Sequence, residues 1–150
     1  MDTTDCVIRW IVRGDMPDVE RIDEMSFSEP WSRDEFTSIL ERRTCIGMVA
    51  LIGDKIVGFV VYGLRSGSLF LLRLAVDPEF RRRGIGGSII TRMKDKLPQQ
   101  NRESIGMRIK ANDPDSNSFL RSQGFRCARI IRHASPRVDD LLFVYHRCAQ

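Results

Sequence analysis

One stretch of this chain decides the expected fold: Leu69-Phe70-Leu71-Leu72-Arg73-Leu74-Ala75-Val76-Asp77-Pro78-Glu79-Phe80-Arg81-Arg82-Arg83-Gly84-Ile85-Gly86-Gly87. Residues 69–76 are apolar at nearly every position, which is typical of a central strand buried on both faces between layers of helices. A short loop, 77–80, separates this strand from the arginines and glycines. A helix with helical apolar spacing is predicted over 84–97, and Pro98 is predicted to end it.

The segment 81–87 has the composition of an anion-binding turn. Glycines permit a tight turn and remove side chains, so that backbone N–H groups can point at an oxyanion. The N-terminus of the following helix adds about half a positive charge, and three arginines add more. The spacing matches neither the triphosphate loop Gly-x-x-x-x-Gly-Lys-Ser/Thr nor the dinucleotide pattern Gly-x-Gly-x-x-Gly. The segment therefore predicts a diphosphate site.

Outward from this stretch, strands and helices are predicted along the whole chain. Helices are expected from Pro17, from a capping box formed by Ser32 and Glu35, and over 116–122 after Asp113 and Pro114. The further strands are predicted over 7–12, 45–52, 56–64, 104–110, 125–132 and 141–146. The expected order is β-α-α-β-β-β-α-β-α-β-β, an α/β (α+β) fold with a mixed sheet of about six to seven strands and helices on both faces.

Length and composition indicate one globular domain, expected over residues 6–147. The chain has 150 residues with 42% hydrophobic and 29% charged, which is the balance of a folded protein rather than a disordered one. No apolar stretch approaches the ~20 residues that a membrane helix needs. The first five residues lack the layout of a signal peptide, so a cytoplasmic location and no membrane partner are expected.

Cysteines and charge exclude two further classes of protein. The cysteines are far apart in sequence and form no Cys-x-x-Cys pair, so free thiols and no metal site are expected. The net charge of +4 is mild, and its one dense run lies beside glycines. A local anion site fits this pattern better than a nucleic-acid-binding face, which is broad and interleaved with aromatics.

The stretch 74–87 resembles motif A of the GCN5-related N-acetyltransferase (GNAT) superfamily, whose pattern is Gln/Arg-x-x-Gly-x-Gly/Ala after a central strand. Residues 121–125, Arg-Ser-Gln-Gly-Phe, resemble the family's later helix end and strand start. The resemblance implies a central strand that splays from its neighbour and acetyl-CoA in the opening. The residues that it implies for the cofactor are Leu74, Ala75, Val76, Arg81, Arg82, Arg83, Gly84, Ile85, Gly86, Gly87 and Asn112.

The segment Ser28-Glu29-Pro30-Trp31-Ser32 resembles the Pro-Trp-Ser region of RimI-type protein N-terminal acetyltransferases. Those enzymes acetylate the α-amine of a protein, typically a ribosomal protein. The resemblance implies an acetyl-CoA-dependent N-acetyltransferase acting on a primary amine, with a protein N-terminus as the acceptor and the loop between the first two helices lining the acceptor site. The oligomeric state, monomer or homodimer, stays open.

Catalytic groups are where this chain departs from the family. An α-amine must lose a proton before it attacks a thioester, yet the positions of the family's glutamate and tyrosine hold Arg108 and Leu120. Glu29 and Tyr145 are the candidate base and acid. The other candidates are Glu24, His133 and Tyr62. Three alternatives remain. One is catalysis by positioning, with water taking the proton. The second is an acetyl-CoA-binding module with little or no turnover, and the third is an acetyltransferase that acts on small-molecule amines.

The expected acceptor contacts are Trp31, Arg73, Arg108 and His133. Arg73 is a charge inside an apolar strand, which is costly unless the charge is paired or faces a cleft. We expect Arg73 to face the acceptor groove, joined by Arg108, and to favour an acidic substrate.

Overall fold

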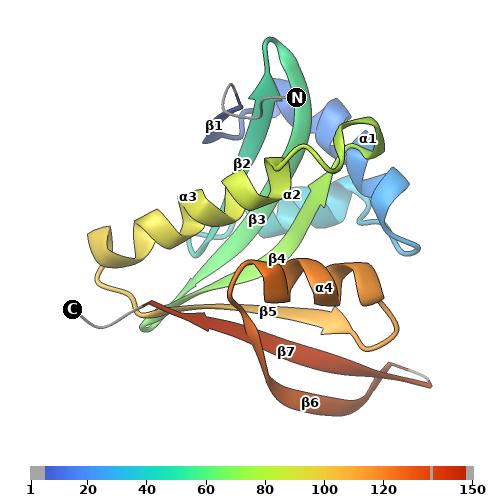
Figure 1. Cartoon of the computed structure of the whole chain (residues 1–150). Helices are drawn as coiled ribbons and strands as arrows, with labels where there is room; N and C mark the ends of the chain where they lie inside the picture. Colours follow the sequence, from blue (N-terminus) through green and yellow to red (C-terminus); the bar gives the residue numbers. More distant parts are fainter. Residues whose placement is uncertain (1–5, 136, 148–150) are drawn as a thin grey trace.

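The computed structural model describes residues 6–135 and 137–147, which form one seven-stranded sheet with helices on both faces (Figure 1). The strands are β1 (Val7–Trp10), β2 (Cys45–Ile52), β3 (Lys55–Arg65), β4 (Ser68–Val76), β5 (Ser104–Lys110), β6 (Arg126–Ser135) and β7 (Val138–His146). The helices are α1 (Met16–Ser26), α2 (Arg33–Leu40), α3 (Ile85–Gln99) and α4 (Pro114–Ser122), with 3-10 turns η1 (Arg13–Asp15) and η2 (Pro78–Phe80).

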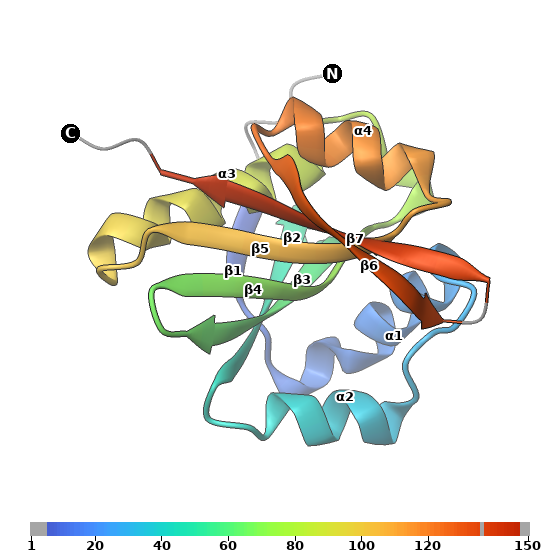
Figure 2. The same ribbon diagram turned by 90° about the horizontal axis from the view of Figure 1, so that it is seen from below.

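The strand order is β1-β2-β3-β4-β5-β7-β6, so β4 is the central strand. Only β4 and β5 pair in parallel, and the other neighbours are antiparallel. Helices α3 and α4 cover one face of the sheet, and α1 and α2 cover the other (Figure 2). The predicted mixed sheet, its element order and the central position of 69–76 are confirmed.

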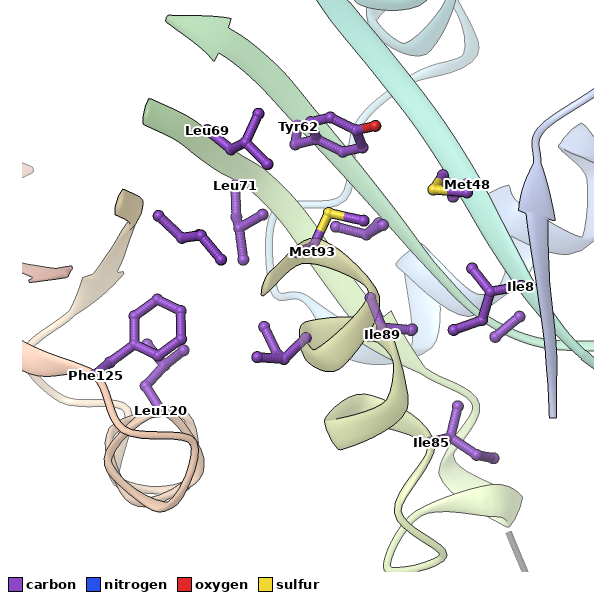
Figure 3. Close-up of a cluster of buried hydrophobic side chains, with 14 of the residues drawn as sticks. Ile8, Met48, Tyr62, Leu69, Leu71, Ile85, Ile89, Met93, Leu120 and Phe125 are labelled. Atoms are coloured by element: carbon purple, nitrogen blue, oxygen red, sulfur yellow. The ribbon is translucent and has the colours of Figure 1, made fainter. Parts of the chain in front are cut away.

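Two hydrophobic clusters hold these layers together, one on each face. Under α3 and α4 lie Tyr62, Leu71, Ile89, Met93 and Leu120, all at most 1% exposed (Figure 3). Under α1 and α2 lie Val19, Ile22, Phe36, Phe59 and Val61, all fully buried. Each such side chain contributes roughly 1.5–3 kcal/mol when it leaves water, so the two clusters fix the central strand from both sides.

The start of α2 follows the predicted capping box. The Ser32 hydroxyl accepts from the Glu35 N–H at 3.1 Å, and the Glu35 carboxylate accepts from the Ser32 N–H at 2.9 Å. These bonds satisfy two backbone donors that a helix start otherwise leaves open. The loop between α1 and α2 therefore ends at a fixed point.

Four predicted boundaries are wrong by more than one residue. Two of them lie in the last pair of strands, because the pairing of β6 with β7 extends to Ser135 opposite Val138. Pro98 lies inside α3 rather than ending it, because a proline in the last turn removes one helical hydrogen bond while Gln100 N–H still donates to Lys96 O at 3.0 Å. Strand β1 ends at Trp10 instead of Val12, because the Val12 N–H donates to the Asp15 carboxylate at 2.8 Å and η1 begins there. Among the helices of the described residues, none is long and apolar enough to cross a membrane.

Candidate active site

The site begins where β4 and β5 separate. Their parallel pairing runs only from Ser68 opposite Ser104 to Leu71 opposite Met107, and the strands then diverge (Figure 1). The register against β3 shifts so that Leu72 is an extra residue on β4. Such a bulge bends a strand and ends regular pairing. Residues 72–76 of β4 therefore have no hydrogen-bonded strand on the side of β5.

The backbone of this strand end faces the opening. The Asp77 N–H donates to Val57 O of β3 at 2.8 Å. Because alternate residues of a strand direct their backbone groups to the same side, Leu74 and Val76 direct theirs away from β3. The Val76 carbonyl indeed accepts from Arg81 Nε at 3.1 Å, outside the sheet. Both residues are among those that the resemblance implies for the cofactor.

A pocket of about 640 Å³ fills the opening. The predicted cofactor residues that line it are Leu74, Ala75, Val76, Arg81, Arg82, Gly84, Ile85, Gly86 and Gly87. The end of α1 adds Ser26 and Phe27, while Met107 of β5 and Phe119 and Leu120 of α4 close the other side. Sequence reasoning missed Ser26, Phe27 and Phe119, because their packing around the pocket depends on contacts between distant elements.

The start of α3 presents open backbone donors to this pocket. Gly84 is in the left-handed conformation (φ 78°), and Ser88 N–H makes the first helical bond, to Gly84 O at 2.9 Å. Among the described residues, no side chain accepts from the N–H groups of Ile85, Gly86 or Gly87, and the first turn holds no acidic residue. Three donors and the positive end of the helix dipole thus remain for an anion. A diphosphate such as that of acetyl-CoA fits this arrangement.

Gly86 has a second role that the sequence pattern did not indicate. A Cβ atom at this position would lie 3.1 Å from the ring of Phe119 in α4. The absence of a side chain therefore lets α3 and α4 approach each other closely beside the pocket. The glycine serves the packing of the helices as well as the access of a ligand to the backbone.

The three arginines of the loop have different surroundings. Arg81 donates to Val76 O and, at 3.3 Å, to the Ser26 hydroxyl, so it ties the loop to β4 and α1. The Arg83 guanidinium stacks on the Phe80 ring at 5.0 Å, and Arg83 does not line the pocket. Arg82 is exposed, lines the pocket and engages no other side chain of the described residues. Arg82 is therefore the arginine of this loop best placed to bind a phosphate group in the pocket.

Asp77 fixes the entry to the loop, a role that sequence reasoning missed. Its carboxylate is 2% exposed, accepts from the Glu79 N–H at 3.0 Å and pairs with Arg21 at 3.2 Å. Burial opposes ionisation, but the Glu79 N–H and Arg21 outweigh it and lower the pKa of Asp77 below its ordinary value. An aspartate directly before a proline was the available signal for this cap.

At the start of α4 the structure places Asp113, and not Asn112, against the pocket. Asp113 caps the helix, accepting from the Ser116 N–H at 3.1 Å and from the Ser116 hydroxyl at 2.6 Å. Asn112 instead borders a separate hollow with Arg137, Val138 and Asp139 among others. The expectation for Asn112 is corrected, because capping turns the neighbouring aspartate toward the pocket.

Arg73 does not present a free charge to an acceptor. Its Nε and Nη2 donate to the Asp23 carboxylate at 2.8 and 3.2 Å, and Nη2 also donates to Glu29 O at 3.0 Å. The Arg73 side chain is 14% exposed and Asp23 is fully buried. The expectation that Arg73 selects an acidic substrate is therefore wrong, because a buried carboxylate already neutralises it.

The other expected acceptor contacts are spread around the opening. The half-buried Trp31 ring packs edge-on against Phe36, with centroids 5.0 Å apart. Arg108 on β5 donates to Asp140 at 2.9 Å and remains 45% exposed. His133 belongs to β6, but its side chain lies outside the described residues.

None of the candidate acids and bases whose side chains the structure describes lines the pocket. Glu24 and Glu29 are exposed. Glu29 accepts a hydrogen bond from Arg73 through its backbone carbonyl rather than through its carboxylate. Tyr145 packs against Phe125 at 5.8 Å under the ammonium group of Lys94. Tyr62 is fully buried in the core, and its burial raises the pKa of the phenol. The described lining holds four ionisable side chains besides its apolar and hydroxyl groups: Arg81, Arg82, Asp113 and Asp115.

Comparison with known proteins places this site in a family. Residues 16–125 match the model of the acetyltransferase (GNAT) family. The [ribosomal protein bS18]-alanine N-acetyltransferase of Escherichia coli (strain K12) is 25% identical over 125 residues, covering 83% of this chain and 84% of that protein. N-alpha-acetyltransferase 30 of Homo sapiens is 24% identical over 148 residues, covering 93% of this chain and 40% of that protein.

The fold is likewise shared with solved structures. The crystal structure of the ribosomal-protein-S18-alanine N-acetyltransferase from Escherichia coli aligns with a TM-score of 0.87 at 21% identity, covering 97% of this chain and 96% of that one. The diverging central strands, the open N-terminus of α3 and the family match agree with one another. The chain therefore belongs to the acetyltransferase (GNAT) family.

Proposed function

We propose that this protein acetylates the N-terminal α-amine of a protein. The observation that carries the proposal is the open start of α3 beside the unpaired end of β4, which suits the diphosphate and the acyl arm of acetyl-CoA at once. The acceptor class is supported by two relatives whose names specify alanine N-acetylation and N-alpha-acetylation. A ribosomal protein as the acceptor and a cytoplasmic location stay predictions.

Different parts of the pocket would bind different parts of acetyl-CoA. Acetyl-CoA, when bound, supplies an acetyl thioester that an amine can attack. The N–H groups of Ile85 to Gly87 would hold its diphosphate, and the backbone groups of Leu74 and Val76 its acyl arm. Apolar walls, among them Phe27 and Leu120, exclude water from the reacting end. Holding two reactants in one geometry supplies several kcal/mol of the barrier without a general base.

Ligand-dependent stability and thiol release test this function. At 100 times its dissociation constant, acetyl-CoA should stabilise the protein by ~2.7 kcal/mol, a rise in Tm of roughly 5–10 °C for a chain of this size. Peptides with a free N-terminus should then release coenzyme A thiol, and N-terminally blocked copies should not. An absent shift at millimolar acetyl-CoA would contradict the cofactor site. A shift without thiol release on N-terminal peptides, polyamines or small amines would favour a binding module.

Because Arg73 is paired with Asp23, Arg108 is the arginine left as a candidate for binding an acidic acceptor. Met107 packs with the core under α3 and α4, so the next residue along β5 points to the face that carries the α1–α2 loop. Arg108→Ala should lower kcat/KM about fivefold for peptides with an acidic second residue and less than twofold for neutral ones, as expected for a partly exposed charge. Arg147→Ala, which breaks a comparable pair with Glu103 at 2.9 Å, is the matched control. Equal losses on acidic and neutral peptides would contradict the assignment.

A further inference from the structure

Asp23 joins three parts of the chain although its side chain is fully buried. It projects from α1, binds Arg73 of β4 through both carboxylate oxygens, and accepts from the Trp31 N–H at 2.8 Å. A buried carboxylate is tolerated only when it is paired and hydrogen-bonded. These three bonds satisfy it and tie the end of the α1–α2 loop to the central strand.

Arg73 holds the same loop from its other side. Beyond its two bonds to Asp23, its Nη2 donates to Glu29 O in the middle of the loop. Its guanidinium carbon lies 3.9 Å from the centroid of the Phe27 ring and 4.7 Å from that of the Trp31 ring. The planar group is thus in contact with two aromatic side chains and a carbonyl of the loop, and Phe27 itself lines the pocket.

We propose that the Asp23–Arg73 pair is a positioning device that fixes the Phe27 wall and the Trp31 end of the loop for the acceptor amine. This inference rests on the proposed function, because the loop borders the place where an acceptor enters. Neither residue lines the pocket. An ion pair of this kind is not required for stability, since well-packed apolar residues often replace one without loss. The planar guanidinium group adds a defined orientation of the loop, because its donors bind both the Asp23 carboxylate and the loop carbonyl.

The variant Arg73→Met keeps the length of the side chain and removes the fork. It should raise the acceptor KM or lower kcat about tenfold or more, as a displacement near 1 Å would do. The dissociation constant of acetyl-CoA should stay within about twofold, because the diphosphate donors lie on α3. Arg73→Lys, with its charge but no fork, should recover less than half of the lost kcat/KM. Full recovery by lysine would overturn the geometric role.

A double variant keeps the test valid if the single one folds poorly. Asp23→Leu with Arg73→Met removes both charges, so no buried ion is left unpaired. The double variant should fold, bind acetyl-CoA and still show the acceptor defect. A wild-type acceptor KM and kcat in this variant would overturn the proposal.

The chain offers a matched control in Arg9 and Asp15. Arg9 also binds a buried aspartate through two bonds, at 2.7 and 3.0 Å, and Asp15 also accepts from a backbone N–H, that of Val12 at 2.8 Å. Neither residue lines the pocket. Arg9→Met and the double Asp15→Leu, Arg9→Met should leave both kinetic constants for the acceptor within about twofold, since they change stability alone. An equal acceptor defect in these controls would contradict the positioning role.

Fluorescence separates a failure of this proposal from a failure of the proposed function. The chain has two tryptophans, and Trp10→Phe leaves Trp31 as the single reporter beside Arg73. In that background, Arg73→Met should increase the acrylamide quenching of Trp31 without any substrate present. If the wild type acetylates no N-terminal peptide, the proposed function fails, and the quenching still tests whether the pair orders the loop. Unchanged quenching together with unchanged acceptor kinetics would overturn the positioning device.

Discussion

Gly87→Asp is expected to weaken acetyl-CoA binding strongly while leaving the free protein at least as stable as the wild type. Gly87 lies in the first turn of α3 and lines the pocket. A carboxylate there is favourable for the helix, worth roughly 0.3–1 kcal/mol, because it faces the positive end of the dipole. The same carboxylate occupies the anion site and repels a diphosphate. Stability and binding should therefore change in opposite directions.

The size of the effect follows from Coulomb's law. Two unit charges about 5 Å apart at an effective dielectric constant of 20 repel by roughly 3 kcal/mol, which corresponds to a loss of affinity on the order of 100-fold. Titration calorimetry and the ligand-dependent Tm measure both quantities. Gly87→Ala is the steric control, because its Cβ would lie 3.4 Å from the flexible Gln123 amide. Thr91→Asp, on the exposed side of the next turn, is the charge control.

Both controls should bind acetyl-CoA nearly as the wild type does. If Gly87→Asp retains binding within a few fold, the start of α3 is not the diphosphate site. If Gly87→Ala loses as much as Gly87→Asp, the defect is one of packing against α4 rather than one of charge. The outcome separates these two roles of the glycines, which the sequence pattern alone could not distinguish.

The elements around this loop were predictable because their signals are local. The apolar run of β4, the glycines after Arg83 and the Ser32–Glu35 capping box each depend on residues a few positions apart. The mixed sheet follows from the order of such elements. The exact end of α3 did not follow, because a proline in the last turn costs only one hydrogen bond.

The side-chain contacts of the site were less accessible to sequence reasoning. Arg73 lies 50 positions from Asp23, and no local pattern marks that aspartate as buried or as its partner. A buried charge indicates that a partner exists, but it does not show which residue that partner is. At Asn112 and Asp113 the prediction chose the wrong one of two adjacent residues. The structure shows that Asp113 caps α4. The loop and the start of α3 that line the pocket could be predicted from local sequence, whereas the contacts of the α1–α2 loop depend on long-range pairs.

The rate of acetylation is expected to follow the ionisation of the acceptor amine. The reacting form is the neutral amine, and an α-amino group has a pKa of about 7.7–8.0. The ionisable side chains in the described lining are two arginines and two aspartates, and no histidine is among them. For an N-terminal peptide, kcat/KM should rise about tenfold per unit below the pKa of the amine and level off above it.

A base on the enzyme would produce a different profile. If a carboxylate such as that of Glu29 takes the proton within the complex, the protonated amine is the productive form, and kcat/KM stays flat below the pKa of the amine. Glu29→Gln would then lower the activity about 100-fold, within the range that a general base contributes. Under positioning alone, the same substitution should change kcat/KM less than threefold and leave the slope unchanged. A flat profile in the wild type would contradict catalysis by positioning.

The same reasoning predicts which amine of a polypeptide reacts. A lysine side chain has a pKa near 10.4, so at pH 7 its neutral fraction is several hundred-fold smaller than that of an α-amine, by the difference in pKa alone. A site without a base cannot compensate for this difference. On a peptide with a free N-terminus and one lysine, mass spectrometry should locate the acetyl group on the α-amine, and raising the pH from 7 to 9 should increase lysine acetylation relative to α-amine acetylation. The difference between the pKa values of the two amines would then determine which of them reacts. The pocket would hold the substrates in place without taking a proton from them.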